Sequence, residues 1–505
     1  MISHGAAADK TCCLDSAISE IRSFLQDALR NGLTFHDFEQ GVHKRILQMG
    51  HAATEDFLAG QGSGDLGPSL TLPDGNVVRR LENLHSRELT CIFGSFTLER
   101  TVYGTREGQK IDFVPLDSRL ALPADKFSYL LLEFNQLFTT EDPFAKVATN
   151  LERLLGLKQH VDSLERQNRS LGETVEAFRK SLPVPAADEE EEILVRTADC
   201  KGVPMRRDAD APTIRNHERK PGPKKDSKKM SVVGAVYTVA AYVRTPEEIV
   251  EALFREPNSE KPQKDRPVPV HKRVIARMNQ YQDDEGCWHD GLADVFMWLC
   301  KQVNERNPLR DKRIVNLMDG EERLWETKDL LPGRGRQVDV LDILHVTPRL
   351  WTAAGLFAAT TSPKAEKQVR QWLLMVLRGQ ANEVIQDMRS KAEKELSKKK
   401  QKEMEKVCGY LETNEQRMKY DKYLKAGYPI ASGVIEGACR HYVKDRMERT
   451  GMSWVQQGAQ PMLELRSTNL NGDWDAFMAF HRESQTSLLH PHRSLLEQIS
   501  WPLAV

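Results

Sequence analysis

Residues 193–199 read ILVRTAD and residues 313–319 read RIVNLMD, two apolar runs that each end on an aspartate. Short runs rich in Ile, Val and Leu are typical of buried β-strands. If the two strands are neighbours in one sheet, Asp199 and Asp319 can face each other across it. A single aspartate after a strand is more commonly a turn former. The pattern alone leaves both interpretations open.

Further strands and helices are predicted around these two runs. Residues 230–243 (MSVVGAVYTVAAYV) indicate one or two strands, residues 290–306 a helix, and residues 337–343 (QVDVLDI) another strand. Strands that alternate with helices favour an α/β layer. The alternation stops at residues 363–428, where charged helical sequence such as EKELSKKKQKEMEK indicates an all-α insertion. A last helix is expected over residues 457–470.

A third acid, Glu436, lies on a helix predicted from Ser432 through Met447. The apolar residues of this helix form one stripe, made of Ile435, Cys439, Tyr442 and Val443. Glu436 lies beside the stripe, so a helix packed on the sheet can point it at the two aspartates. A glutamate near a helix start more commonly compensates the helix dipole.

Three carboxylates that converge on one point repel each other unless cations neutralise them. Hard oxygen ligands select Mg²⁺ or Mn²⁺. Two such ions suit phosphodiester chemistry, because one activates a water or a 3′-hydroxyl and the other stabilises the leaving oxygen. If the three acids do converge, we expect two divalent ions there and no covalent nucleophile from the protein.

The N-terminal part has a different pattern. Residues 14–60 carry apolar positions at helical spacing and predict two amphipathic helices. Residues 89–104 (LTCIFGSFTLERTVYG) alternate about Gly94-Ser95 and predict a β-hairpin. Three helices within residues 127–178, with Gly156 at one corner, are consistent with a helix-turn-helix unit that enters the major groove, or with a helical packing domain.

These patterns give a predicted order of domains and segments. They are 1–180, an N-terminal region for DNA binding and dimerisation; 181–192 (SLPVPAADEEEE), a linker; 193–362, the first part of the α/β core; 363–428, the all-α insertion; 429–480, the C-terminal helices of the core; and 481–505, a tail.

Composition sets the class of protein. The 505 residues are 40% hydrophobic and 29% charged, which suits a folded chain of roughly two to four domains. No run of about 18 apolar residues occurs, and the first residues lack the layout of a secretion signal. We expect a cytoplasmic protein without a membrane segment. The net charge of −1 means that nucleic-acid binding depends on local clusters, at residues 215–229 and 391–406, unless these are solvated faces.

The eight cysteines include no C-x-x-C pair, which predicts free thiols in a cytoplasmic chain. Cys287-Trp288-His289 with Cys300 downstream is only a loose approximation to a zinc site, because zinc needs four ligands at tight spacing.

One long stretch resembles a known family. Residues 431–477 (ASGVIEGACRHYVKDRMERTGMSWVQQGAQPMLELRSTNLNGDWDAF) resemble the C-terminal signature of ISKra-type bacterial insertion-sequence transposases, which are relatives of the Mutator-like group. Further segments with this resemblance are FGSFTLERTVYG, LDSRLALPADKFS, ADCKGVPMRR, VVGAVYTVAAYVRTPEEIVEALF and MDGEERLW, and together they extend over about residues 80–480. The resemblance implies an RNase H-like catalytic core.

The resemblance also implies a DDE triad of catalytic and metal-binding residues. Asp199 matches the aspartate of the first strand, Asp319 that of the MDG segment and Glu436 the glutamate of the GVIEG helix. The separations of 120 and 117 residues leave room for the insertion before the glutamate. One departure is that the first motif reads DCKG instead of DGTG, which places Lys201 near the acid and puts the local geometry in doubt.

Residues 342–345 (DILH) resemble the D/C-x-x-H motif that follows the second aspartate in Mutator-like relatives. On a helix, positions i and i+3 share a face, so Asp342 and His345 can hydrogen-bond beside the site. The alternative is an N-capping aspartate and a packed histidine. If the motif is functional, we expect His345 to contact DNA or orient a group instead of binding metal.

Candidate DNA-binding residues follow Glu436. Trp454 can stack on an unpaired base, although a core position is the commoner use of such a tryptophan. Four cations beside Glu436 can hold phosphates or be plain surface charges. They are Arg440, Lys444, Arg446 and Arg449.

The function implied is a bacterial transposase that binds the terminal inverted repeats of an insertion sequence, cuts DNA and joins the freed 3′-hydroxyls to target DNA. Its partners are double-stranded DNA and further copies of the chain, at least a dimer when two ends are synapsed. It is expected in the cytoplasm, at the nucleoid when bound to DNA. Two rivals remain: a metal-dependent nuclease without strand joining, and an inactive transposase-derived DNA-binding protein, which the DCKG segment favours.

Overall fold

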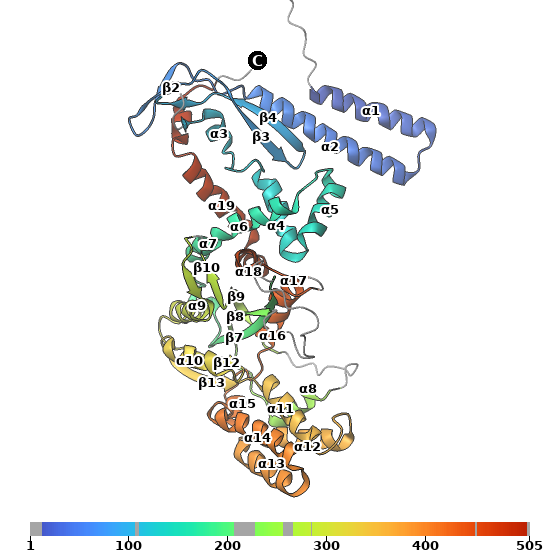
Figure 1. Cartoon of the computed structure of the whole chain (residues 1–505), viewed down its shortest axis with the longest axis vertical. Helices are drawn as coiled ribbons and strands as arrows, with labels where there is room; N and C mark the ends of the chain where they lie inside the picture. Colours follow the sequence, from blue (N-terminus) through green and yellow to red (C-terminus); the bar gives the residue numbers. More distant parts are fainter. Residues whose placement is uncertain are drawn as a thin grey trace, which may run out of the picture. The chain divides into compact units, whose positions relative to one another are not determined.

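The computed structural model describes residues 13–106, 111–206, 228–255, 266–283, 285–449 and 452–501 (Figure 1). The chain divides into two compact units, unit 1 with Met1–Ser170 and Trp474–Val505, and unit 2 with Leu171–Asp473. Residues 474–480 thus group with unit 1, whereas the sequence assigned them to the end of the core. Within the described ranges, no helix combines the length and the apolar character that a membrane span requires.

Unit 1 begins with a helical hairpin made of α1 (Cys13–Asn31) and α2 (Phe35–Gly60). The rings of Phe24 and Phe38 stack across the hairpin with their centroids 6.0 Å apart. The two amphipathic helices predicted from apolar spacing are therefore confirmed.

The predicted β-hairpin of unit 1 is also confirmed. Strand β3 (His85–Cys91) pairs antiparallel with β4 (Gly94–Arg100). Gly94 has φ 135°, which side chains other than glycine rarely adopt, so the tight turn depends on it. A second sheet of unit 1, in the order β1-β2-β5-β6, was missed because its strands are too short to show a period. These strands are β1 (Ser69–Thr71), β2 (Val77–Arg80), β5 (Tyr103–Gly104) and β6 (Ile111–Phe113).

Helices make up the rest of this part of the chain. They are α3 (Pro115–Leu120), α4 (Tyr129–Glu141), α5 (Phe144–Leu155), α6 (Val161–Glu173), α19 (Trp474–Leu489) and η5 (Arg493–Gln498). Gly156 ends α5 in the left-handed conformation, with φ 68°. The predicted helices with Gly156 at a corner are confirmed, and their docking on DNA stays a prediction.

A five-stranded mixed sheet forms the centre of unit 2. Its strands are β7 (Ile193–Pro204), β8 (Lys228–Val239), β9 (Val270–Met278), β12 (Arg313–Met318) and β13 (Arg336–Leu341). Their spatial order is β13-β12-β7-β8-β9. Strands β7, β8 and β9 are antiparallel neighbours, whereas β12 runs parallel to β7 and β13 parallel to β12. The predicted α/β layer is present, with β9 as an additional strand.

Helices cover both faces of this sheet. Helices α9 (Gly291–Arg306) and α10 (Glu322–Leu330) lie on one face, in a core that includes Leu194. Helix α11 (Ile343–Gly355) lies on the other face, in a core that includes Val195. Adjacent residues of β7 thus enter different cores, as the alternation of side chains along a strand requires.

The predicted all-α insertion is present. It consists of α12 (Pro363–Leu377), α13 (Ala381–Glu395), α14 (Lys398–Thr413), η3 (Glu415–Arg417) and α15 (Tyr420–Lys425), and it packs on α11 together with α8 (Pro246–Leu253). The hydroxyls of Tyr420 and Tyr423 donate to the backbone carbonyls of Leu341 (2.8 Å) and Asp339 (2.9 Å) on β13. These two bonds fix the insertion on the end of the sheet.

Short elements complete unit 2. They are α7 (Val175–Ser181), η1 (Ala187–Glu189), the hairpin strands β10 (Gln280–Gln282) and β11 (Trp288–Asp290), α16 (Gly433–Ala438), the π-helical turn η4 (Cys439–Lys444), α17 (Asp445–Met447) and α18 (Gln456–Leu470). The helix predicted from Ser432 through Met447 is therefore present but contains a π-helical turn. Such turns are frequent at functional sites.

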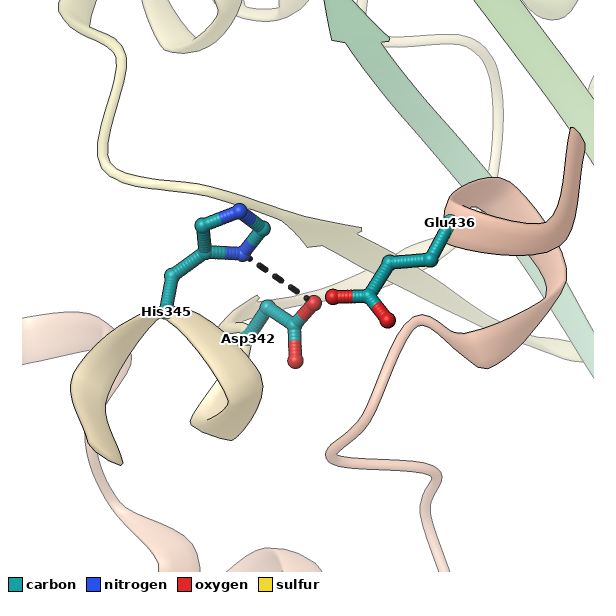
Figure 2. Close-up of side chains that lie close together, drawn as sticks. All are labelled: Asp342, His345 and Glu436. Carbon is teal, nitrogen blue, oxygen red and sulfur yellow. Dashed lines mark hydrogen bonds and ion pairs between the residues drawn. The ribbon is translucent and has the colours of Figure 1, made fainter. Parts of the chain in front are cut away.

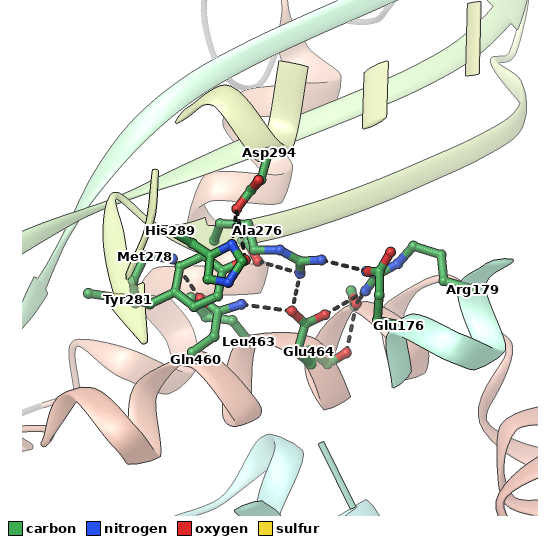
Figure 3. Close-up of polar contacts among 12 residues, drawn as sticks. Glu176, Arg179, Ala276, Met278, Tyr281, His289, Asp294, Gln460, Leu463 and Glu464 are labelled. Atoms are coloured by element: carbon green, nitrogen blue, oxygen red, sulfur yellow. Dashed lines mark hydrogen bonds and ion pairs between the residues drawn. The ribbon is translucent and has the colours of Figure 1, made fainter. Parts of the chain in front are cut away.

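A buried polar network joins α7, α18 and β9 (Figure 3). Arg277 of β9 forms ion pairs with Glu464 of α18 and, at 2.9 Å, with Glu176 of α7. Arg179 donates to the other oxygen of Glu464 at 2.6 Å. Burial alone raises the pKa of Glu464, but the charges of Arg277 and Arg179 hold that pKa below its ordinary value. The network fixes α18 against the outer strand of the sheet.

Candidate active site

The strand register brings Asp199 and Asp319 to the same level of the sheet. On the parallel strands β7 and β12, Val195 is paired with Val315, so paired residues differ by 120 in number. Asp199 and Asp319 differ by the same number. Both also continue the alternation of Val195 and Val315, whose side chains enter the core beneath α11. The register extended by three residues places Asp199 of β7 level with Asp319, the residue that follows β12, and the charge of Asp199 acts on Asp319.

Asp342 lies at the same level on the third parallel strand. Leu341 of β13 pairs with Met318 of β12, so the next residues along are Asp342 and Asp319. The amide of Asp342 still donates to the Met318 carbonyl at 2.9 Å. Asp319 and Asp342 thus follow the ends of β12 and β13, and Asp199 lies within the longer neighbouring strand β7. The carboxyl ends of parallel strands are where open α/β sheets bind ligands.

Glu436 is brought to Asp342 by contacts at the start of α16. The amide of Ile343 donates to the Ile430 carbonyl at 2.9 Å, and the hydroxyl of Ser432 donates to Asp342 Oδ2. Ligand atoms of Asp342, His345 and Glu436 lie within 4.8 Å of one another. Figure 2 shows the Glu436 carboxylate directed at Asp342. Asp199 and Asp319 are not members of that group, although their charges act on it.

Asp342 is both an N-cap and a partner of His345, the two interpretations that the sequence left open. Asp342 caps α11, because its Oδ1 accepts from the Leu344 amide at 2.9 Å. Its Oδ2 lies 3.3 Å from Nδ1 of His345. Asp342 is fully buried, and the His345 side chain is 36% exposed. The capping aspartate therefore also orients an imidazole that reaches solvent.

The electrostatics of the site are those of crowded acids. Burial raises the pKa of Asp319, and the negative charge of Asp199 raises it further. Burial and the charges of Asp342 and Asp199 raise the pKa of Glu436. The hydrogen bond to Asp342 raises the pKa of His345, and the charges of Asp342, Asp319 and Asp199 add to this effect. The charge of Asp199 raises the pKa of all three groups.

Asp199 has a partner that the sequence did not assign to it. The thiol of Cys439, in the π-helical turn η4, donates to Asp199 Oδ2 at 3.3 Å. The other oxygen, Oδ1, accepts from the amide of Cys200 at 2.6 Å. Cys439 was recognised only as part of an apolar stripe, because a thiol carries no sequence signal that separates packing from hydrogen bonding. Lys201, which follows Cys200 in the DCKG segment, is half-buried.

The insertion also reaches the site, which the sequence did not indicate. A Cβ on Gly320, the residue after Asp319, would lie 2.4 Å from Cε2 of Tyr410 on α14. The guanidinium of Arg349 lies 4.5 Å from the centroid of the same ring. Burial and the charge of Asp319 raise the pKa of Tyr410. Tyr410 therefore packs directly on the turn that carries Asp319.

The predicted DNA-binding residues fall into two groups. Arg440, Lys444 and Arg449 are exposed, so a phosphate contact stays a prediction for them. Arg446 is fully buried with its guanidinium 4.8 Å from the ring of Trp454, which is itself only 7% exposed. This burial does not fit the expected DNA contacts of Arg446 and Trp454. Trp454 instead has the core position, with Nε1 donating to the Met447 carbonyl at 3.0 Å.

The basic clusters and the loose zinc motif form no second candidate site among the described residues. Residues 215–227, which are most of the first basic cluster, lie outside those residues. In the second cluster, Lys391 pairs with Asp387 and Lys406 with Glu403, both at 2.8 Å, as on a solvated helix face. His289 of the loose zinc motif is held by Asp283 at 2.8 Å. The described cysteines are free thiols, as predicted.

The donor set at the sheet edge suits a hard divalent cation. Asp199, Asp319 and Glu436 offer carboxylate oxygens, which Mg²⁺ and Mn²⁺ prefer. The charge of Asp199 contributes to the raised pKa values of both Asp319 and Glu436, although Glu436 is exposed. The ligand atoms that lie within 4.8 Å of one another are those of Asp342, His345 and Glu436, so metal binding by Asp199 and Asp319 together with Glu436 stays a prediction.

Comparisons with known proteins give little similarity. No protein-family model matches the chain, and no curated protein matches it. The chain is similar at a low level to a solved structure described as the Drosophila P element transposase strand transfer complex. The identity is 10%, the match covers 70% of this chain and 80% of that chain, and the TM-score is 0.24. A TM-score of this size carries no argument about fold or function.

Proposed function

We propose that the chain is a DDE transposase, which binds the terminal inverted repeats of an insertion sequence and catalyses metal-dependent strand cleavage and strand transfer. The observation that carries this proposal is the register. The offset of 120 between β7 and β12 is also the separation of Asp199 and Asp319. This match supports neighbouring positions for the two acids, and the bond from Ser432 to Asp342 supports a position for Glu436 beside the residue that follows β13.

The topology supports an RNase H-like core as part of the proposal. The first three strands of the sheet are antiparallel, and the fourth and fifth are added parallel to the first on its other side. This is the order that an RNase H-like core has. The proposed acids occupy the first strand, the end of the fourth strand, and a helix that follows the fifth. The insertion lies between the second acid and the third.

Asp199, Asp319 and Glu436 would hold two Mg²⁺ or Mn²⁺ ions. When bound, such ions activate a water or a 3′-hydroxyl and stabilise the leaving oxygen. The chain's own groups position these acids. The Cys439 thiol orients the Asp199 carboxylate, and the Glu321 amide orients that of Asp319 through Oδ1 at 3.0 Å. The exposed Arg440, Lys444 and Arg449 would hold DNA phosphates beside Glu436.

The test is cleavage of DNA that carries the inverted repeats flanking this gene, in Mg²⁺ and in Mn²⁺. Wild type is compared with Asp319→Asn and Glu436→Gln, and with the controls Asp311→Asn and Glu326→Gln, which change exposed acids. Cleavage that the first pair abolishes and the second pair retains supports the proposal. Binding of the ends by wild type without cleavage in either metal contradicts it, and favours the inactive DNA-binding protein.

A second arm separates a transposase from a nuclease. The cleaved ends are offered to a supercoiled target, and covalent joining of the 3′-ends is followed by the mobility of the target. Joined products that require Asp319 support strand transfer. Cleavage without joining indicates a metal-dependent nuclease instead of a transposase. Cross-linking on paired ends tests the expectation that at least two copies act together.

A further inference from the structure

A cavity of about 460 Å³ opens between the β10–β11 hairpin and the start of α10. Its size falls within the range of small-molecule sites, which is roughly 300–1,000 Å³. It is lined by Asn279, Gln280, Trp288, His289, Asp290 and Arg323. This lining contains an indole, two side-chain amides, an imidazole, a carboxylate and a guanidinium, which is a set that can stack on a ring and hydrogen-bond its edge.

Trp288 is the most unusual member of the lining. Its side chain is 64% exposed, although a tryptophan is one of the largest apolar groups in proteins. It lies on β11, where it pairs with Gln282 of β10. The indole is thus carried on a hairpin at the mouth of the cavity, with most of its surface available to another planar group.

The hairpin that carries Trp288 is anchored through its other face, where Tyr281 and His289 lie. The rings of Tyr281 and His289 stack with centroids 5.0 Å apart. The Tyr281 hydroxyl donates to Asp294 at 2.8 Å, and His289 Nε2 lies 2.8 Å from Asp283. Each ring is held by a carboxylate, so these contacts anchor the hairpin that carries Trp288.

Arg323 connects the cavity to the three acids. It is exposed on the first turn of α10, whose start is tied to Asp319: the Glu321 amide donates to Asp319 Oδ1 at 3.0 Å, and the Trp325 indole donates to the Asp319 carbonyl at 2.7 Å. The charge of Arg323 also acts on Cys200, the neighbour of Asp199. Arg323 therefore lies on a helix whose start is bonded to Asp319.

We propose that this cavity binds one unpaired nucleotide of the DNA, with its base stacked on Trp288, the base edge hydrogen-bonded by Asn279 and Gln280, and its phosphate on Arg323. Every base has a flat face, so such stacking tolerates any sequence. The inference rests on the proposed function, which supplies the polynucleotide. It goes beyond that function by assigning a site that prefers unpaired over paired DNA.

The test measures binding, in EDTA, by fluorescence anisotropy of a labelled single-stranded oligothymidylate and of a labelled duplex. Trp288→Ala should raise the Kd for the single strand about 10-fold and leave the Kd for the duplex unchanged. Trp288→Phe should recover most of the loss. The control is Leu330→Ala at the other end of α10, where an 81% exposed apolar side chain is shortened without touching the cavity.

The inference is overturned if Trp288→Ala binds the single strand as wild type does, or if Leu330→Ala loses as much. It is also overturned if free thymidine monophosphate displaces the oligonucleotide at equal nucleotide concentration, because the site would then take a mononucleotide. Since EDTA excludes cleavage, the outcome is separate from that of the proposed function. If wild type cleaves DNA but Trp288→Ala binds the single strand normally, only the inference is refuted. If single-strand binding depends on Trp288 but wild type does not cleave DNA, only the transposase proposal is refuted.

Discussion

In metal-free buffer, replacing Asp319 by asparagine is expected to stabilise the protein. Burial and the negative charge of Asp199 raise the pKa of the Asp319 carboxyl. A raised pKa means that the folded state disfavours the ionised form, a penalty that the unfolded chain does not carry. Asparagine removes the charge, and its side-chain oxygen can still accept the hydrogen bond from the Glu321 amide.

The expected gain is about 1 kcal/mol, in the range of single stabilising substitutions. It corresponds to a rise of roughly 2–4 °C in Tm. The sign depends on pH. The folded state keeps the Asp319 proton to a higher pH than the unfolded chain, so the penalty is complete above the folded pKa. It disappears as the pH falls below the ordinary value of 3.8. The gain from Asp319→Asn should therefore be largest at neutral pH and fade in acid.

When metal is added, wild type should become more stable than Asp319→Asn. A ligand present at 100 times its Kd stabilises the folded state by about 2.7 kcal/mol, and Asp319→Asn should lose most of this gain. Scanning calorimetry in EDTA and in a Mg²⁺ series measures both effects, with the exposed Asp311→Asn as the control. The reasoning is refuted if Asp319→Asn is less stable than wild type in EDTA at neutral pH, or if it gains as much from Mg²⁺.

Two further predictions concern the neighbours of the aspartates. Cys439→Ala removes the thiol that donates to Asp199 Oδ2. It should raise the Mg²⁺ concentration for half-maximal cleavage by roughly 2- to 10-fold. Cys439→Ser keeps a donor and should leave this concentration close to that of wild type. Gly320→Ala places a Cβ 2.4 Å from the Tyr410 ring and should lower the cleavage rate. Adding Tyr410→Ala should restore part of the rate. A double variant that is no faster than Gly320→Ala would contradict steric coupling of the two residues.

Much of the fold could be predicted because its signals are local. The strands that carry Asp199 and Asp319 are apolar runs in the sequence, and both are present in the structure. The insertion is recognisable from its helical, charged sequence. Strand β9 was missed because His271, Lys272 and Arg273 interrupt its apolar alternation. These side chains are at the outer strand of the sheet, where charges are tolerated.

The candidate site depends on pairing between distant segments, which the sequence does not show directly. Nothing local distinguishes Trp454, which is buried under Arg446, from a tryptophan that faces DNA. The contacts of Cys439 and Tyr410 likewise require the tertiary arrangement, because their partners Asp199 and Gly320 lie far away in the chain. The expectation that Asp342 and His345 interact came from helical spacing, a local rule, and the structure confirms it.

The insertion belongs to a segment whose two ends are hydrogen-bonded to each other beside the sheet. The segment between Asp342 and Ile430 contains α11 and then the insertion. The Ile430 carbonyl accepts from the amide of Ile343, and Ser432 bonds to Asp342. Because these bonds fix both ends, the length of the segment need not alter the position of Glu436, and lengthening a closed loop costs little free energy. Its content is not neutral, however, since Tyr410 reaches back to Gly320 and packs on the turn of Asp319. Changes to the insertion should therefore affect the second acid more than the third.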